Sequence, residues 1–302
     1  MNGWLVVNEF AVWSKFQDLF RMFMESAERL GIRLSKKSGA EIWFELGRNS
    51  YKSHIDADFV LFWDKDVKLA HVLETLGVPV FNSSSSIALC DDKSLTHLEL
   101  SRHDDLRLPR TFISPKKNFS DGKTDPEIMS IAEELGFPCI IKECFGSFGY
   151  NVFLARDITE LVDIIRDIDV KPYLIQEFIS SSKGRDIRLQ VVGGRVITSM
   201  YRYNDTDFRA NLTNGGSMKK YIPTKAQEYA AIMACRYLGV DFAGVDILFG
   251  EDDAPVICEV NSNAHFKNLF DCTGVNTADV ILEYIIDRIS TTGSSRHGSY
   301  QK

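Results

Sequence analysis

Apolar runs alternate with helix-like stretches over the first part of the chain. Phe59–Trp63 is apolar at every position, as in a strand with helices on both faces, and residues 5–7 and 78–81 form shorter runs of the same kind. Between residues 5–7 and Phe59–Trp63, further apolar residues recur at helical spacing and predict a helix. The pattern predicts an N-terminal α/β domain over residues 1–90, and the polar residues 82–86 predict a linker at its end.

The rest of the chain, to about residue 290, is rich in predicted strands. Asp91 or Asp92 predicts the start of one helix, and Thr224 with Gln227 three residues later predicts a capping box at the start of another. Short apolar runs predict strands at residues 138–142, 152–154, 174–177, 187–192, 196–201, 244–248 and 258–261. The last residues, 291–302, are small and polar, so we expect a disordered tail.

The composition is that of a globular protein with one large or two to three small domains. The 302 residues are 44% hydrophobic, which is enough for a sizeable core. The net charge of −7 argues against a nucleic-acid partner, because phosphate backbones are bound chiefly through excess Lys and Arg. No apolar run reaches the ~18 residues of a membrane span, and the N-terminus does not resemble a secretory leader. We therefore expect a cytoplasmic protein without a membrane partner.

Two predicted strands near the C-terminal end carry oxygen-bearing side chains. Glu259 and Asn261 share one face of their strand because they are two residues apart, and Asp246 lies in the preceding strand. A turn over residues 250–255 would make the two strands antiparallel neighbours. Such hard ligands suit Mg²⁺ or Mn²⁺, particularly when a nucleotide phosphate supplies further oxygens. On its own, the pattern is equally compatible with an ordinary hairpin that turns polar residues to solvent.

A lysine and a glycine-containing loop form a second candidate site. Lys142 ends an apolar strand, and Gly146 and Gly149 follow in the next few residues. A lysine beside such a loop can place an ammonium group and backbone N–H groups around a polyphosphate. A strand, a lysine and a glycine turn also occur together in many hairpins without any ligand.

Charged and amide side chains follow in the next part of the chain. Glu177 in an apolar strand and Asp186 in the segment after it could hold adenine and ribose through hydrogen bonds. Arg188 shares a strand face with Asp186, and Arg209 and Asn211 add donors that suit charge developing on a phosphoryl group. Taken singly, either arginine is also compatible with a solvated loop.

The order of these motifs resembles that of the ATP-grasp superfamily, and more narrowly that of the RimK-type amino-acid ligases. The resemblance covers almost the whole chain through residue 290. It implies the ATP-grasp fold, with an N-terminal α/β (pre-ATP-grasp) domain at 1–90 and two α+β lobes at 91–175 and 176–290. The motifs that carry it are Lys93, Lys142, the glycine loop, residues 176–179, Arg185–Arg188, residues 209–211 and the group Asp246, Glu259 and Asn261.

The resemblance also implies roles for individual residues. ATP would contact Lys93, Lys142, Gly146, Ser147, Gly149, Gln176, Glu177, Phe178, Ile179, Asp186, Arg209 and Asn211. Two Mg²⁺ (or Mn²⁺) ions would bind Asp246, Glu259 and Asn261, with Glu259 bridging them. Arg188, Arg209 and Asn211 would act at the reacting carboxylate and the γ-phosphate.

Two segments depart from the family pattern. Tyr150 and Asn151 replace the small or basic residues of the family's glycine loop. After Asn261 the family commonly has a small residue and Ser-Pro-Gly, whereas this chain has the sequence Ser-Asn-Ala-His-Phe-Lys. His265 in that segment could be a general base near the incoming nucleophile, or it could simply pack or form a hydrogen bond.

The implied activity is ATP-dependent ligation of a carboxylate to an amine through an acyl-phosphate, with an amino acid as one substrate. Alternatives that the residues leave open are a kinase of the same fold and a catalytically silent ATP-binding protein. The expected partners are small-molecule carboxylates and amines, with a peptide or protein acceptor as a further option. Relatives often form dimers or tetramers, so a homo-oligomer is among the expected states.

Overall fold

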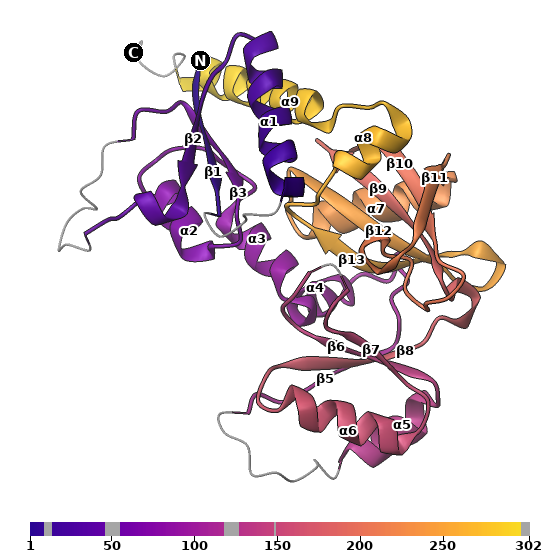
Figure 1. Ribbon diagram of the computed structural model, residues 1–302. Helices are drawn as coiled ribbons and strands as arrows, with labels where there is room; N and C mark the ends of the chain where they lie inside the picture. Colours follow the sequence, from indigo (N-terminus) through magenta and orange to yellow (C-terminus); the bar gives the residue numbers. More distant parts are fainter. Residues whose placement is uncertain (9–13, 46–54, 118–126, 148, 297–302) are drawn as a thin grey trace.

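The computed structural model describes residues 1–8, 14–45, 55–117, 127–147 and 149–296. Within these residues the chain forms three sheets with helices packed against them (Figure 1). None of the helices described is both long and apolar enough to cross a membrane.

The N-terminal sheet is parallel and has the strand order β2-β1-β3-β4. Its strands and the helices beside it are β1 (Asn2–Val7), α1 (Ser14–Arg29), β2 (Arg33–Ser38), β3 (Phe59–Trp63), α2 (Val67–Thr75) and β4 (Val80–Phe81). Alternate residues of β3 face opposite sides, so Leu61 packs on the α1 side and Phe62 on the α2 side. Phe59–Trp63 is apolar at every position because a helix covers each face of the sheet, as predicted.

The central sheet is antiparallel, with the order β5-β8-β6-β7. It consists of β5 (Thr111–Ile113), β6 (Cys139–Glu143), β7 (Val152–Ala155) and β8 (Tyr173–Glu177), and its helices are α5 (Glu127–Leu135) and α6 (Ile158–Ile168). One face packs on these helices in a separate core that includes Ile141, Leu161 and Ile175. Figure 1 shows this lobe standing apart from the other two sheets.

The third sheet is antiparallel and has the order β11-β10-β9-β12-β13. Its elements are β9 (Arg185–Val192), β10 (Arg195–Tyr203), β11 (Ser217–Lys220), α7 (Lys225–Tyr237), β12 (Phe242–Phe249) and β13 (Pro255–Asn261). Ile187, Leu189 and Val191 of β9 pack in one core with the alanines of α7. The alternate residues 186, 188 and 190 therefore face the opposite side of the sheet.

Further helices connect these units. They are α3 (Ser84–Asp91), α4 (Lys93–Leu100), α8 (Lys267–Thr273) and α9 (Thr277–Arg296), with short 3₁₀ turns at Gly39–Glu41, Ser180–Ser182, Leu212–Asn214 and Glu251–Asp253. Helix α9 lies beside α1 (Figure 1), and Arg29 Nη2 is 2.6 Å from Asp279 Oδ1 across this contact. A single hydrophobic core joins α1 and the N-terminal sheet to α8, α9 and part of the third sheet.

Two predictions about the connecting segments were wrong. The serines after Asn82 do not form a linker: Ser83 caps helix α3, and Glu74 accepts hydrogen bonds from both the backbone and the hydroxyl of Ser84. The tail expected at 291–302 is helical at its beginning, because α9 continues to Arg296. The hydroxyls of Ser290 and Thr291 donate to backbone carbonyls one turn earlier, which lets small polar residues remain helical. Residues 297–302 lie outside the described part of the chain.

Candidate active site

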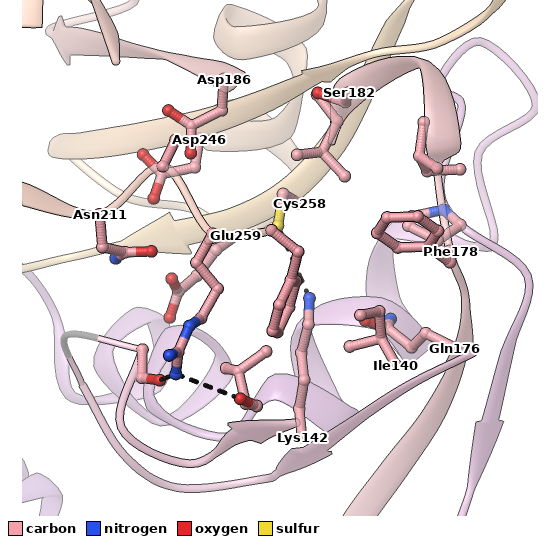
Figure 2. Close-up of a pocket in the computed structure, with 18 of the residues that line it drawn as sticks. Ile140, Lys142, Gln176, Phe178, Ser182, Asp186, Asn211, Asp246, Cys258 and Glu259 are labelled. Atoms are coloured by element: carbon pink, nitrogen blue, oxygen red, sulfur yellow. Dashed lines mark hydrogen bonds between the residues drawn. The ribbon is translucent and has the colours of Figure 1, made fainter. Parts of the chain in front are cut away.

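A cavity with about 970 Å³ of empty space, open to solvent, lies between the central lobe and the third sheet. Every residue predicted to bind the nucleotide lines it, together with Asp246 and Glu259 of the predicted metal site. Figure 2 shows side chains from both lobes pointing into this space, with Ile140 and Gln176 at one end and Asp186 and Asp246 at the other. The cavity is therefore apolar at one end and strongly charged at the other.

Two lysines approach the charged end from different elements. Lys142, near the end of β6, extends toward β13 and places its Nζ 3.6 Å from Cys258 Sγ (Figure 2). Lys93, at the start of α4, donates from Nζ to the carbonyl of Gly146 at 3.1 Å and lies 3.8 Å from Glu259 Oε1. Both ammonium groups are mostly buried, so their charge acts in a medium of lower polarity than water.

Gln176 of β8 is fixed at the apolar end of the cavity. Its amide nitrogen donates to Thr111 Oγ1 at 2.8 Å and lies 3.0 Å from His97 Nε2. Burial and then the charge of Lys142 lower the pKa of His97 to about 3, so the imidazole is neutral and can accept this bond. The Gln176 Oε1 atom is buried and has no hydrogen-bond partner in the described residues. It is an acceptor held ready for a ligand donor.

The glycine loop between β6 and β7 is connected to the loop that follows β10. Arg209 donates from Nη1 to the carbonyl of Gly149 at 2.8 Å and to that of Val152 at 3.3 Å. Its other nitrogens bind the carboxylate of Asp207. Gly146 has a φ of 139°, a conformation that side-chain-bearing residues rarely adopt. Arg209 thus closes one side of the cavity between the two lobes.

A ladder of ion pairs crosses the face of the third sheet opposite α7. Arg188 holds both oxygens of Asp246 at 2.6 Å, and Arg202 holds both oxygens of Asp186 at 2.7 Å. Arg202 also lies 3.0 Å from Asp246 Oδ2. Burial opposes the charge of Asp246, but the two arginines outweigh it and lower its pKa to about 2. Burial raises the pKa of Asp186 despite Arg202. The two arginines therefore favour the ionised form of Asp246.

The predicted hairpin of metal-binding residues has the expected geometry. Strands β12 and β13 are antiparallel, with Asp246 opposite Glu259 and Gly244 opposite Asn261. The amide nitrogen of Asn261 is buried without a hydrogen-bond partner among the described residues. No three His, Cys, Asp or Glu side chains in that part of the chain are grouped to hold a metal by themselves. A cation here would need amide oxygens or ligand phosphates as well.

A second cavity, with about 1480 Å³ of empty space open to solvent, adjoins the first. Both cavities are lined by Ser147, Arg202, Asn211 and Glu259. The predicted catalytic residues Arg188 and His265 and the predicted metal ligand Asn261 line the second cavity. The His265 ring meets the edge of Phe16, with 6.2 Å between the ring centres. The predicted residues are therefore divided between two connected spaces.

Sequence patterns did not single out every residue that shapes these spaces. Arg202 was not among the predicted site residues, yet it is the buried centre of the ion-pair ladder. His97 of α4 and Asp64 at the end of β3 were not predicted as site residues. Nothing in the sequence around either residue indicates that it lies at a cavity rather than at the surface. The signal that could have found Arg202 is its position on an apolar strand two residues beyond a buried methionine, Met200.

The amino-acid sequence matches the model of the RimK-like ATP-grasp domain over residues 90–285. The chain is 36% identical to human N-acetylaspartylglutamate synthase A over 73% of its own length and 56% of that protein. It is 35% identical to the probable alpha-L-glutamate ligase 1 of Shewanella over 74% of its length and 72% of that protein. It is 29% identical to the uncharacterized protein MG012 of Mycoplasma genitalium over 88% of its length and 92% of that protein.

Solved structures share its fold. The structure of D-alanine–D-alanine ligase from Bacillus anthracis complexed with ATP has a TM-score of 0.71 at 17% identity, covering 98% of this chain and 99% of that one. The ATP-grasp ligase PsnB, complexed with a minimal precursor, Mg and ADP, has a TM-score of 0.69 at 16% identity, covering 95% and 98%. The expected ATP-grasp fold is confirmed, and the chain belongs to the RimK-like ATP-grasp family of ATP-dependent ligases.

Proposed function

We propose that this ligase joins a carboxylate to the amine of an amino acid or a peptide-like acceptor, through an acyl-phosphate. The observation that carries the proposal is the pair of adjoining cavities with Arg202, Asn211 and Glu259 at their junction. A carboxylate at the junction would attack the γ-phosphate of ATP in the first cavity, releasing ADP. The amine in the second cavity would then attack the acyl carbon, and phosphate would leave with the electrons of the broken C–O bond.

The first cavity fits ATP in its chemistry. The unpartnered Gln176 Oε1 matches the exocyclic amino group of adenine, and Phe178 and Ile179 supply apolar surface beside it. Lys93 and Lys142 would bind the phosphates, with the backbone of the loop at Gly146, Ser147 and Gly149 covering them. We propose that Glu177 lies beside the adenine and Asp186 near the ribose; both residues line the cavity, Asp186 toward its charged end.

Mg²⁺ fits the opposite end, because the donors there are hard oxygens. Asp246, Glu259 and Asn261 would bind two ions, with Glu259 between them, and phosphate oxygens would complete the coordination. The ions would neutralise charge on the transferring phosphoryl group. The unpaired amide of Asn261 supports its role, since a bound phosphate oxygen would give that buried nitrogen a partner.

The remaining polar residues would act on the reacting groups. Arg209 and Asn211 would face the γ-phosphate and the acyl-phosphate, while Arg188 would orient the carboxylate from the second cavity. His265, in the same cavity, would accept a proton from the attacking amine. Asn211 would lie at the junction of the two cavities, where the acyl-phosphate forms.

Two relatives bear on the substrate. The names of the human and Shewanella relatives specify N-acetylaspartylglutamate synthesis and glutamate ligation, which favours an amino acid as the amine. Another PsnB structure is complexed with a precursor peptide, which keeps a peptide acceptor within the proposal. We propose the lobe boundaries 1–90, 91–175 and 176–290 as the units that enclose this site.

The test is ADP and phosphate release with Mg²⁺ and ATP across a panel of amino acids, supplied singly and in pairs. We expect one carboxylate to stimulate release by the native protein and Glu259→Gln to lower that rate about 100-fold or more, because it removes a charge at the metal and the phosphate. Glu251→Gln, which changes an exposed acid in the turn of the same hairpin, is the matched control and should have the native rate.

Trapping with hydroxylamine separates the ligase from a kinase of the same fold. An activated carboxylate gives a hydroxamate with hydroxylamine, whereas a phosphate ester does not. ADP release without hydroxamate would contradict the proposed ligase. ATP binding without any stimulated release would point to a silent nucleotide-binding protein or to a macromolecular acceptor outside the panel.

A further inference from the structure

The second cavity lies at the carboxyl ends of the parallel strands β1 and β3. In the order β2-β1-β3-β4, the chain passes from β1 to one side of the sheet and then returns to the other side to form β3. Ligands of open parallel sheets bind at such a reversal point, outside the carboxyl ends of the strands. Asn8 directly follows β1 and Asp64 directly follows β3, and both line the cavity.

Asp64 is buried at this position, with an exposed fraction of 6%. Its Oδ1 atom accepts hydrogen bonds from the backbone of Lys65 at 2.6 Å and from the amide of Asn8 at 3.1 Å. These two bonds fix the orientation of the carboxylate. Its other oxygen, Oδ2, has no hydrogen-bond donor or cationic partner in the described part of the chain.

The charges around the cavity distinguish Asp64 from its neighbours. Arg188 and Arg202 are paired with Asp246, and Lys65 Nζ is paired with Asp91 at 2.6 Å. The acidic side chains among the described lining residues are Asp64 and Glu259, and Glu259 lies near Lys93. A buried carboxylate without a cation is costly, so a ligand cation would be stabilised beside Asp64.

We propose that Asp64 binds the ammonium group of the amine substrate and so holds the acceptor amino acid in the second cavity. The bound ammonium would pass one proton to solvent before the neutral amine attacks the acyl carbon, and His265 would accept the proton released in that attack. Trp63, Phe16 and Phe20 form the apolar wall beside it, which strengthens the attraction by excluding water. The inference rests on the proposed ligase function and adds to it the residue that selects the amine. It gives the N-terminal sheet a direct part in substrate binding.

The variant that tests this role is Asp64→Asn. Asparagine keeps the oxygen that accepts from Lys65 and has almost the same shape, so the fold is retained while the charge is lost. We expect KM for the amine to rise about tenfold or more in the amide-forming reaction, as for loss of a charged hydrogen bond. KM for the carboxylate and the rate of hydroxamate formation with excess hydroxylamine should stay within about twofold of native, because that reaction does not use the ammonium subsite.

Two further variants separate binding from structure. Asp66→Asn removes an exposed carboxylate two residues away, which caps α2 through the backbone of Leu69, and should leave both KM values unchanged. Asp64→Glu restores the charge in a longer side chain, and we expect it to bind the amine more tightly than Asp64→Asn does. A purely structural role would not favour the glutamate, because it fits the buried position less well.

The outcomes distinguish this inference from the proposed function. An unchanged KM for the amine in Asp64→Asn would overturn the inference while leaving the ligase intact. A raised KM for the carboxylate in the hydroxylamine reaction would also overturn it, by assigning Asp64 to the other substrate. Failure of the native protein to form any hydroxamate would overturn the proposed function, and this inference with it.

Discussion

At the scale of a single residue, Asp246 has two competing partners, the arginines that bind it in the structure and the metal ion proposed to bind it. Its carboxylate is held by Arg188 and Arg202, yet the proposed metal site requires one of its oxygens. A cation at Asp246 would therefore compete with the arginines, and an arginine released in that way would be free to bind a phosphate or carboxylate oxygen. The ion-pair ladder holds the two guanidinium groups in a fixed orientation.

The ladder makes stability depend on pH. The folded-state pKa of Asp246, about 2, lies below its ordinary value of 3.8. Its stabilising contribution is therefore complete above about pH 4 and is lost as the pH falls toward 2. We expect Asp246→Asn to lower the free energy of unfolding by on the order of 2 kcal/mol at pH 7, and by less at pH 3.

Urea unfolding of both proteins at the two pH values, without nucleotide or Mg²⁺, measures this difference. Asp252→Asn, in the exposed turn after β12, is the control and should change little at either pH. A difference between native protein and Asp246→Asn that is the same at pH 7 and pH 3 would contradict the assignment of the charge to Asp246.

Residues that act in pairs along one strand could be predicted from the sequence. The spacing of Glu259 and Asn261 predicted that they share one face of a strand, and the turn between the strands predicted the antiparallel pairing with the strand of Asp246, which the register shows. Asp64 and His97 could not be found in this way. Their roles depend on which strands become neighbours and which helix lies behind β8, and these are contacts between segments far apart in the sequence.

At the scale of elements, the segment after β13 packs closely against strand β12. Gly244 lies opposite Asn261, and a Cβ atom at Gly244 would be 2.5 Å from the Cβ of Ala264. The glycine thus allows the segment after β13 to lie directly on β12. That segment carries His265 toward the second cavity.

We expect Gly244→Ala to cost about 1–3 kcal/mol of stability, because the added methyl group has no space. It should also lower the ligase rate, since the His265 segment must move away from β12. Urea unfolding and the amide-forming assay measure the two effects. The double variant Gly244→Ala, Ala264→Gly removes the opposing methyl group, and recovery of both properties is expected; a double variant no better than the single one would contradict steric conflict as the cause.

Elements with regular apolar patterns were predictable, and the serine run was not. Thr224 and Gln227 form the capping box expected of helix α7, and Asp92 caps α4. Residues 82–86 look like a linker in composition, but small serines can also pack where large side chains cannot. The carboxylate of Glu74 in α2 accepts hydrogen bonds from the backbone and the hydroxyl of Ser84 at the start of α3. This tertiary contact favours a helix over a linker there.

At the scale of the whole molecule, Asn82 joins the N-terminal domain to the third sheet. Its amide nitrogen donates to the carbonyls of Phe242 and Ser262, and its oxygen accepts from the backbone of Asp241 and Phe242. The side chain is buried, with an exposed fraction of 1%. One residue thus satisfies four backbone groups that would otherwise be buried without partners.

We expect Asn82→Ala to lower the free energy of unfolding by about 3 kcal/mol or more, because those backbone groups lose their partners. Asn82→Asp keeps one accepting oxygen but turns the other toward the carbonyls of Phe242 and Ser262, so it should cost at least as much at pH 7. Ser85→Ala, an exposed change three residues later in α3, is the control and should stay within about 0.5 kcal/mol of native in urea unfolding. Equal losses for Asn82→Ala and Ser85→Ala would contradict the proposed connection.

The shared hydrophobic core has a consequence for how the chain can be divided. Phe23 and Trp63 of the N-terminal domain pack against Phe242 and Phe266, whereas the central lobe has a core of its own. A fragment cut at residue 90, where the family match begins, would leave that aromatic surface open to water and would be prone to aggregate. We therefore expect the first 90 residues and the third sheet to unfold together, because they share one hydrophobic core.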